Sequence, residues 1–247
     1  MTPTLLLQFI NQNGNILLTL SGNSPTPPAI SSLLAEFDIH LPQDRNSAVL
    51  DHFTYDASSA PEAHDVLLLP TLHSGRPGLR PVLGLDGTVA FPRAVGQELG
   101  ASRPLLTPIL QAKDTSYTHS LKDEAEYAED PFAVGSQISL VTTMQARNSA
   151  RFTVFGSLEA LQDQWFDAEV KSGDGTTTPT HNRAFARQVS AWTFQELGVL
   201  KVGRVEHRLS LASPATSTNR SLTELGPANP LMYRIKNDIV SDCHLLF

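Results

Sequence analysis

Hydrophobic residues along this chain switch between strand-like and helix-like spacing, which is typical of an α/β protein. Short runs rich in Val, Ile, Leu and Phe at residues 15–20, 48–53 and 66–69 predict buried strands. Residues 2–12 and the segment after Pro27 instead place hydrophobic residues three and four positions apart, which predicts helices. A strand, a helix and a strand at this spacing favour parallel pairing with right-handed crossovers.

Each predicted helix carries a start or stop signal. Gly14 ends the first helix, and the second begins with Thr26 as its N-cap and Pro27 as its first residue. A third helix is predicted to begin with Asn182 as its cap. The residues predicted to face inward from the three helices are Leu6, Phe9, Ile10, Ile30, Leu33, Leu34, Phe37, Phe185, Val189 and Trp192.

The stretch from 138 to 166 predicts a strand pair followed by a helix. Residues 138–145 and 151–155 are rich in β-branched and aromatic residues, and the polar segment between them suits a turn, since Asn148 tolerates a positive φ. Gly156 ends the second strand and Ser157 can cap a following helix. That helix would place Leu158, Leu161, Trp165 and Phe166 on one face.

Other parts of the chain are rich in turn-forming residues. Residues 71–108 predict loops and short hairpins, one of them at 81–90. Residues 199–209 predict a strand, and residues 211–230 are a polar linker. The acidic segment 123–130 is interpreted as a solvated loop rather than a cation or partner site.

Composition narrows the class of protein. The 247 residues are 40% hydrophobic, enough to bury a core, and the net charge of -7 argues against nucleic acid as a partner. The single cysteine, Cys243, permits no intramolecular disulfide and is interpreted as a stray thiol. No run approaches the roughly 20 apolar residues of a membrane helix.

Two segments invite a catalytic interpretation. Ser157 follows a strand, where a nucleophile elbow would lie, but Phe155 and Glu159 occupy the positions that such an elbow gives to glycine. Asp51 and His52 resemble a carboxylate–imidazole pair. However, neighbours in a strand point to opposite faces, so a structural role at the end of a strand is favoured.

The remaining chemistry is sparse. We find no zinc-binding frame of His and Cys, no phosphate-binding loop and no Asp-x-Asp triplet, so we expect no catalytic residue, cofactor or metal. Arg147 and Arg151 flank the turn before the second strand, where each could pair with a partner subunit or within the chain. Trp165 and Trp192 lie on apolar helical faces and are predicted to be core residues.

Several segments together resemble one known family. Residues 145–151 read Gln-Ala-Arg-Asn-Ser-Ala-Arg and residues 155–158 read Phe-Gly-Ser-Leu, where the family has Ser in place of Phe. Residues 48–56, 115–117 and 192–203 agree in the same order. The chain thus resembles the wheat-germ-agglutinin-binding-protein-type subunit of oligosaccharyltransferase, the endoplasmic reticulum complex that places a preassembled glycan on asparagine.

The resemblance implies a domain organisation and a fold. We expect a lumenal α/β domain at 1–210, a linker at 211–230 and a truncated start of a β domain at 231–247. The first domain would hold a flavodoxin-like or class I amidotransferase-like, mostly parallel sheet with helices on both faces. It would lack its N-terminal strand, because a doubly wound sheet rarely opens on a helix. We therefore hypothesise that the chain is part of a longer lumenal region.

The function implied by the resemblance is that of a noncatalytic, scaffolding subunit at the lumenal side of the endoplasmic reticulum membrane. Its partners would be the multi-spanning catalytic subunit and subunits of the ribophorin II and defender-against-cell-death types, with membrane association through parts absent from this chain. Asn219 lies in a glycosylation sequon, and Arg147, Arg151, Asp51 and His52 are candidate interface residues. The alternatives are an independent α/β hydrolase or amidotransferase-like enzyme and a stand-alone carbohydrate-binding module.

Overall fold

The computed structural model of the chain comprises two compact units, Met1–Leu197 and Gly198–Phe247. The first unit ends before residue 210, where the sequence suggested a boundary. In the second unit, strand β13 (Val205–Leu209) pairs antiparallel with β14 (Leu231–Ile235). The residues that the structure describes are 2–44, 46–71, 87–100, 105–120, 130–199, 205–209 and 231–235.

The larger sheet of the first unit is built around strand β9. β10 pairs antiparallel with one edge of β9 and β7 pairs antiparallel with the other. β1 pairs in parallel with β10, and β6 pairs antiparallel with both β9 and β2. The six strands are β1 (Ile16–Thr19), β2 (Ile39–His40), β6 (Gln97–Leu99), β7 (Leu106–Gln111), β9 (Ile138–Gln145) and β10 (Arg151–Phe155).

Three strand pairs complete the first unit. Backbone hydrogen bonds of 2.8 Å run from Val49 N–H to the Ala94 carbonyl and from Val95 N–H to the Gly156 carbonyl, so residues 94–95 link the pair that contains Val49 to the end of β10. All three pairs are antiparallel. They are β3 (Ser47–Leu50) with β8 (Tyr117–Ser120), β4 (Val66–Pro70) with β5 (Thr88–Pro92), and β11 (Glu169–Lys171) with β12 (Thr177–Pro179).

The α/β class is confirmed, but the expectation of a mostly parallel sheet is wrong for the described residues. Among their strand pairs, only β1 and β10 run parallel. Parallel neighbours need a long crossover, whereas β9 and β10 are joined by the short turn at 146–150. The sequence also missed β5, β6 and β7, because the many Pro and Gly residues of 71–108 concealed their strand pattern.

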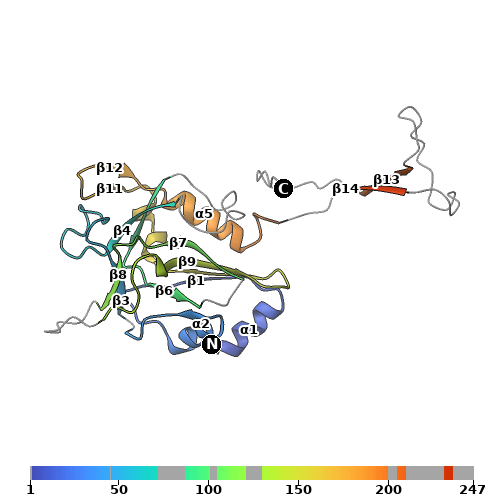
Figure 1. The fold of residues 1–247 in the computed structure, drawn as a ribbon, viewed down its shortest axis with the longest axis horizontal. Coiled ribbons are helices and arrows are strands. Elements are labelled where there is room, and N and C mark those ends of the chain that lie inside the picture. Colours follow the sequence, from blue (N-terminus) through green and yellow to red (C-terminus); the bar gives the residue numbers. More distant parts are fainter. Residues whose placement is uncertain are drawn as a thin grey trace. The chain divides into compact units, whose positions relative to one another are not determined.

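Helices cover both faces of the larger sheet, as expected. Figure 1 shows α5 (Asn182–Thr193) above the strands and α1 (Pro3–Asn11) with α2 (Pro28–Glu36) below them. All three helices lie close to their predicted positions, although α2 begins at Pro28, one residue later than predicted. Strong 3.6-residue periodicity located these elements because each helix buries one face.

β10 divides the core between the two helical layers. Phe152 and Val154 belong to the hydrophobic cluster that also contains Ile10 of α1 and Leu34 of α2. Phe155 points to the other face, where its ring centroid lies 6.0 Å from that of Phe185 in α5. Successive strand residues point to opposite faces, and all five residues of β10 are buried, so the strand is covered on both sides.

The end of α1 differs in detail from the prediction. Asn13 takes the left-handed conformation with φ 66°, and Gly14 N–H bonds to the Phe9 carbonyl at 2.8 Å. This is a Schellman motif with Asn, rather than Gly, at the left-handed position. Leu6 and Ile10 are buried as predicted, but the Phe9 side chain is 49% exposed.

Asn182 is the first residue of α5 rather than its cap, which is His181. Its buried amide group pairs with the backbone of β5 as a neighbouring strand would. The amide oxygen accepts from Ala90 N–H, and the amide nitrogen donates to the Ala90 carbonyl, both at 2.8 Å. A third bond, 3.0 Å long, reaches the carbonyl of Ala160. One side chain therefore joins α5, β5 and the segment after β10.

We expect Asn182→Ala to lower the free energy of unfolding by about 2 kcal/mol, because three buried backbone groups lose their partner. Arg187→Ala, at an exposed position on the same helix, should change it by less than about 0.5 kcal/mol. Urea denaturation followed by circular dichroism measures both. Equal stabilities of the two variants would contradict this role of Asn182.

Several predictions fall on residues outside the described ranges. They are Cys243, Asn219, the linker at 211–230, most of the acidic segment at 123–130 and most of the hairpin at 81–90. In the described part of the chain, no helix is long and apolar enough to span a membrane.

Candidate functional site

The segment that follows β3 is anchored by the buried carboxylate of Asp51. One carboxylate oxygen accepts the backbone N–H groups of Phe53 at 2.8 Å and Thr54 at 3.1 Å. The other accepts the hydroxyl groups of Thr54, Thr115 and Ser116 at 2.7, 2.8 and 2.9 Å. Five donors from two distant segments thus converge on one side chain.

Burial of Asp51 acts to raise the pKa of its carboxyl group, but the hydrogen bonds from Thr54, Phe53, Thr115 and Ser116 outweigh burial and leave the pKa below its ordinary value. The group is therefore ionised at neutral pH, and its oxygens are occupied by donors of the chain itself. This arrangement suits an anchor rather than a general base.

A second buried carboxylate, that of Asp56, lies at the other end of the same segment. Its oxygens accept the backbone N–H groups of Ser58, Ser59 and Lys171 at 3.2, 3.1 and 2.8 Å, together with both serine hydroxyl groups. Burial raises its pKa, but hydrogen bonds led by those from Ser59 and Lys171 lower the pKa by more. Lys171 belongs to β11, so Asp56 ties the segment to the β11–β12 pair.

Between the two carboxylates, the segment carries aromatic side chains at the surface. Phe53 is 71% exposed and His52 is also exposed. The Nε2 atom of His52 lies 2.8 Å from the Tyr117 hydroxyl, and its Nδ1 atom forms a hydrogen bond with Nδ1 of His64. Asp51 and His52 thus face different partners and do not form a catalytic pair. We call residues 51–56 the anchored loop.

The turn between β9 and β10 contains the two arginines that the sequence singled out as interface candidates. Arg147 is exposed at the turn. Asn148 donates to the carbonyl of Ile10 at 2.8 Å, which fixes the turn to the end of α1. The positive φ of 71° belongs to Ser149 rather than to Asn148.

Arg151, by contrast, is only 3% exposed. Its Nη1 donates to the carbonyls of Trp192 at 2.5 Å and Leu197 at 2.7 Å, and the guanidinium carbon lies 4.6 Å from the centre of the Trp192 ring. Burial lowers the pKa of Arg151. The structure places Arg151 within the chain, where its bonds to these carbonyls hold the end of α5.

Ser157 is a buried structural residue. Its hydroxyl donates to the Pro92 carbonyl at 2.5 Å and accepts the N–H of Ala160 at 3.2 Å. The second bond caps the turn that follows β10, as predicted, and leaves no exposed nucleophile. That turn continues as two short pieces, η3 (Glu159–Leu161) and α4 (Asp163–Phe166), instead of the single helix expected.

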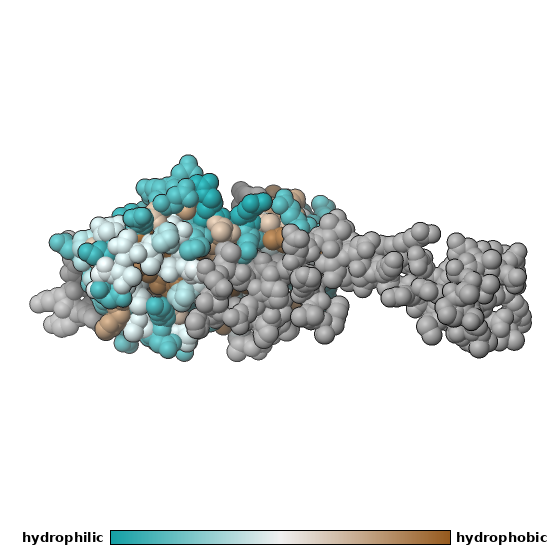
Figure 2. Space-filling view, turned by 90° about the horizontal axis from the view of Figure 1, so that it is seen from above, coloured by the Kyte–Doolittle hydropathy of each residue, from teal (hydrophilic) through white to brown (hydrophobic). Residues whose placement is uncertain are grey.

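The two tryptophans pack as predicted. Trp192 is 3% exposed, and Trp165 is partly buried against a hydrophobic cluster that includes Val66 and Leu68 of β4. Figure 2 shows one face of the described part as mainly hydrophilic, with small separate hydrophobic spots. Isolated exposed hydrophobic residues are normal on soluble domains and do not define a binding surface.

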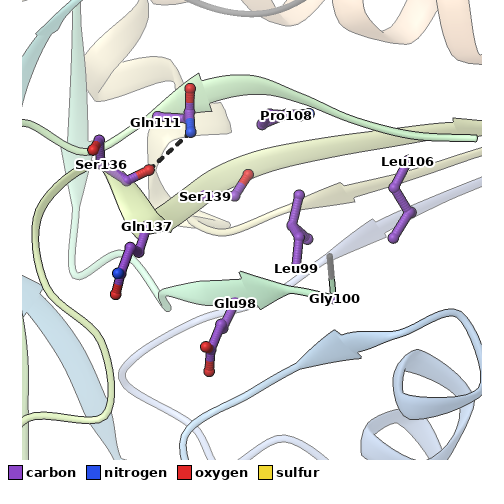
Figure 3. A pocket seen from close by; sticks show the side chains of 9 residues that line it. All are labelled: Glu98, Leu99, Gly100, Leu106, Pro108, Gln111, Ser136, Gln137 and Ser139. Carbon is purple, nitrogen blue, oxygen red and sulfur yellow. Dashed lines mark hydrogen bonds between the residues drawn. The ribbon is translucent and has the colours of Figure 1, made fainter. Parts of the chain in front are cut away.

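A hollow of about 450 Å³ lies over β9 between β6 and β7. Figure 3 shows Leu106 and Pro108 on one side of it, Glu98 and Leu99 on the other, and a 2.8 Å hydrogen bond from Gln111 to the Ser136 carbonyl. Glu98 is the single ionisable residue among the nine that line the hollow. These lining residues therefore do not pair a nucleophile with a base.

Sequence reasoning found part of this site. The anchored loop and residues 115–117 both lie in segments that resemble the family, but no pattern in the sequence indicated that they meet in space. His64 and Asp56 were missed as site residues. No motif links His64 to His52, since the two lie on separate segments that only the fold brings together.

The described residues define the chain as a mixed α/β domain. A solved structure with a similar fold is described as "mmIFT52 N-terminal domain", with a TM-score of 0.50 and 16% identity over 77% of this chain and 69% of that one. The chain belongs to the OST48 family: its residues 1–196 match the family described as "OST48, N-terminal domain". The resemblance noted from the sequence is thereby confirmed.

Relatives from three organisms agree. The chain is 29% identical to the dolichyl-diphosphooligosaccharide–protein glycosyltransferase subunit wbp1 of Schizosaccharomyces pombe over 97% of its own length and 49% of the relative's. It is 32% and 31% identical to the 48 kDa subunits of the same enzyme from Danio rerio and Drosophila melanogaster, covering 49% and 45% of them. The chain therefore spans about half the length of these curated relatives.

Proposed function

We propose that the chain is part of a noncatalytic subunit of oligosaccharyltransferase, the complex that transfers a preassembled glycan from dolichyl diphosphate to asparagine in Asn-x-Ser/Thr sequons. The observation that carries this proposal is the family match over residues 1–196. The names of the relatives from yeast, fish and fly support it. The domain would lie on the lumenal side of the endoplasmic reticulum membrane.

The role assigned to the domain is scaffolding. The carboxylate oxygens of Asp51 and Asp56 accept hydrogen bonds from donors of the chain itself, and the buried Ser157 hydroxyl caps a turn. An independent hydrolase or amidotransferase-like enzyme would have used Ser157 or the pair Asp51 and His52, which do not bond each other. The geometry instead favours a rigid domain that presents surface residues to neighbouring subunits.

Arg147 is the residue we assign to such a contact. Its side chain is exposed on a turn that Asn148 holds against α1. Because the backbone of the turn is already ordered, a partner that binds the guanidinium group does not bear the entropic cost of ordering it. Exposed arginines are enriched among residues that dominate binding energy at protein interfaces. The partners would be the multi-spanning catalytic subunit and subunits of the ribophorin II and defender-against-cell-death types.

Affinity purification of the tagged, full-length protein from its own cells tests the function. We expect the catalytic subunit to co-purify, and we expect Arg147→Glu to reduce its recovery about tenfold or more, as loss of a dominant contact of about 1.4 kcal/mol or more would. Arg187→Glu, an equal charge reversal at an exposed position of α5, should leave recovery unchanged.

Two results would contradict different parts of the proposal. Purification of the unmodified protein without any glycosyltransferase subunit would reject its membership of the complex. Equal recovery with Arg147→Glu and Arg187→Glu would reject only the contact assigned to Arg147. Occupancy of sequons in a secreted reporter, measured in the same cells, reports whether each change reaches the reaction.

A further inference from the structure

Four polar aromatic side chains meet at the anchored loop, where the ring centroid of Tyr55 lies 4.0 Å from that of His64. His52 follows β3, His64 precedes β4, and Tyr117 belongs to β8. The Nδ1 atoms of the two histidines face each other, and Nε2 of His52 lies 2.8 Å from the Tyr117 hydroxyl. On the far side of His64, Nε2 lies 3.2 Å from the Pro61 carbonyl.

The hydrogen-bond partners determine which nitrogens carry protons. A carbonyl oxygen only accepts, so Nε2 of His64 is the donor and carries its proton. Neutral His64 therefore directs the lone pair of Nδ1 toward His52. The Tyr117 hydroxyl can donate or accept, so His52 can carry its proton on either nitrogen without losing this contact.

The two tautomers of His52 give the pair two different properties. With the proton on Nδ1, His52 donates it to His64. With the proton on Nε2, His52 donates to Tyr117, and two nitrogen lone pairs converge on one point. The second state has the electronic arrangement of two histidine ligands of a metal ion.

We propose that His52 and His64 form a two-ligand site for a divalent transition-metal ion, with Zn²⁺ as its representative. The ring centroids are 4.7 Å apart. Two imidazoles bound to one ion at about 2.0–2.1 Å, with ligand angles between square and tetrahedral, have centroids roughly 4.5–5.2 Å apart. The ring centroids already lie in this range, and the two Nδ1 atoms would move apart to admit the ion.

The surroundings supply what a histidine site requires. Ligating histidines nearly always donate their other N–H to a carbonyl or another polar group, which fixes ring orientation, and Pro61 and Tyr117 serve that purpose here. Asp51 holds the backbone beside His52 in place, so little ordering is needed on binding.

Within the described residues, no group of three or more His, Cys, Asp or Glu side chains is placed to bind one ion. The site therefore has two protein ligands, and water or a partner's side chain would complete the coordination. His52 is exposed, so the ion has a direct path from solvent.

Calorimetric titration of the purified 247-residue chain with ZnCl₂ tests the proposal, with Cys243→Ser as background to remove the thiol as a competing ligand. We expect one ion per chain at micromolar affinity. His52→Ala and His64→Ala should each abolish this binding. Tyr117→Phe, which keeps both ligands but removes the outer hydrogen bond, should weaken it about tenfold.

His40→Ala is the matched control, because His40 is an exposed histidine on β2 that pairs with Asp38. It should bind Zn²⁺ as the background protein does. Thermal melts of every variant establish that the chain remains folded. Long-range ¹H–¹⁵N spectra provide a second measurement, in which Zn²⁺ should move the His52 proton from Nδ1 to Nε2. Absence of binding up to about millimolar Zn²⁺, or equal binding by His52→Ala, would overturn the proposal.

Discussion

Replacing Asp51 by alanine is expected to lower the free energy of unfolding of the first unit by about 3–5 kcal/mol. The change removes the acceptor of two backbone N–H groups and three hydroxyl groups, among which the Ser116 hydroxyl is buried. Domains are stable by only about 5–15 kcal/mol, so this one substitution would bring the unit close to unfolding at physiological temperature.

The measurement is chemical denaturation of the purified chain with and without the change. Asp114→Ala provides the control, since Asp114 is an exposed carboxylate next to Thr115 and should contribute less than about 0.5 kcal/mol. Asp51→Asn, which keeps one acceptor oxygen for the backbone donors, should fall between the two. Stability of Asp51→Ala within the range of the control would show that the anchored loop does not depend on this carboxylate.

The same carboxylates predict how stability depends on pH. The pKa values of Asp51 and Asp56 are lowered in the folded chain below the ordinary value of 3.8. Their stabilising contribution is therefore complete above that value and is lost as pH falls through the lower, folded pKa. Asp51→Asn should make the free energy of unfolding depend less on pH in this acidic window, because asparagine does not titrate. An unchanged acid profile would contradict this contribution of Asp51.

Arg151→Ala is the second substitution with a large expected effect, about 3 kcal/mol of destabilisation. The guanidinium group bonds the carbonyls of Trp192 and Leu197 and lies over the Trp192 ring, so its removal breaks two hydrogen bonds and leaves a cavity beside the end of α5. Arg151→Lys retains the charge but lacks the planar guanidinium group that lies over the Trp192 ring, so it should recover only part of the loss.

The neighbouring Arg147 gives this prediction a control within the same turn. Arg147 is exposed, so Arg147→Ala should alter the free energy of unfolding by less than about 0.5 kcal/mol. Thermal and urea denaturation of the three variants measure the difference. If Arg147→Ala and Arg151→Ala were equally stable, the two arginines would not have the separate structural and surface roles that their burial assigns.

These two arginines also illustrate how far the sequence leads. Their positions on either side of a strand turn were predictable, because residues 138–145 and 151–155 carry a strong strand pattern. Their different burial was not predictable, because the partners of Arg151 lie some forty residues further along the chain, at Trp192 and Leu197. A local pattern shows that a residue lies in a strand but not what covers it.

In the candidate site, too, the sequence located residues in strands but did not show which distant residues contact them. The sequence showed that Asp51 ends a strand and that Asp51 and His52 point apart. It could not show that Thr115 and Ser116 complete the anchor of Asp51, or that His64 lies against His52. These contacts join residues separated by loops, and the hydrophobic core rather than the loops decides where such segments meet.

By itself, the sequence determined the positions of the three long helices and of strands β1, β3, β4, β9 and β10, the α/β class and the family, because burial periodicity and ordered motifs are local properties. The tertiary structure alone decided that the sheet is mainly antiparallel among the described strands, since a strand buried on both faces has the same pattern in either direction. It also decided that Arg151 is covered while Arg147 is not, and that His52 meets His64. Each of these depends on contacts between distant segments, which form only when the whole chain packs.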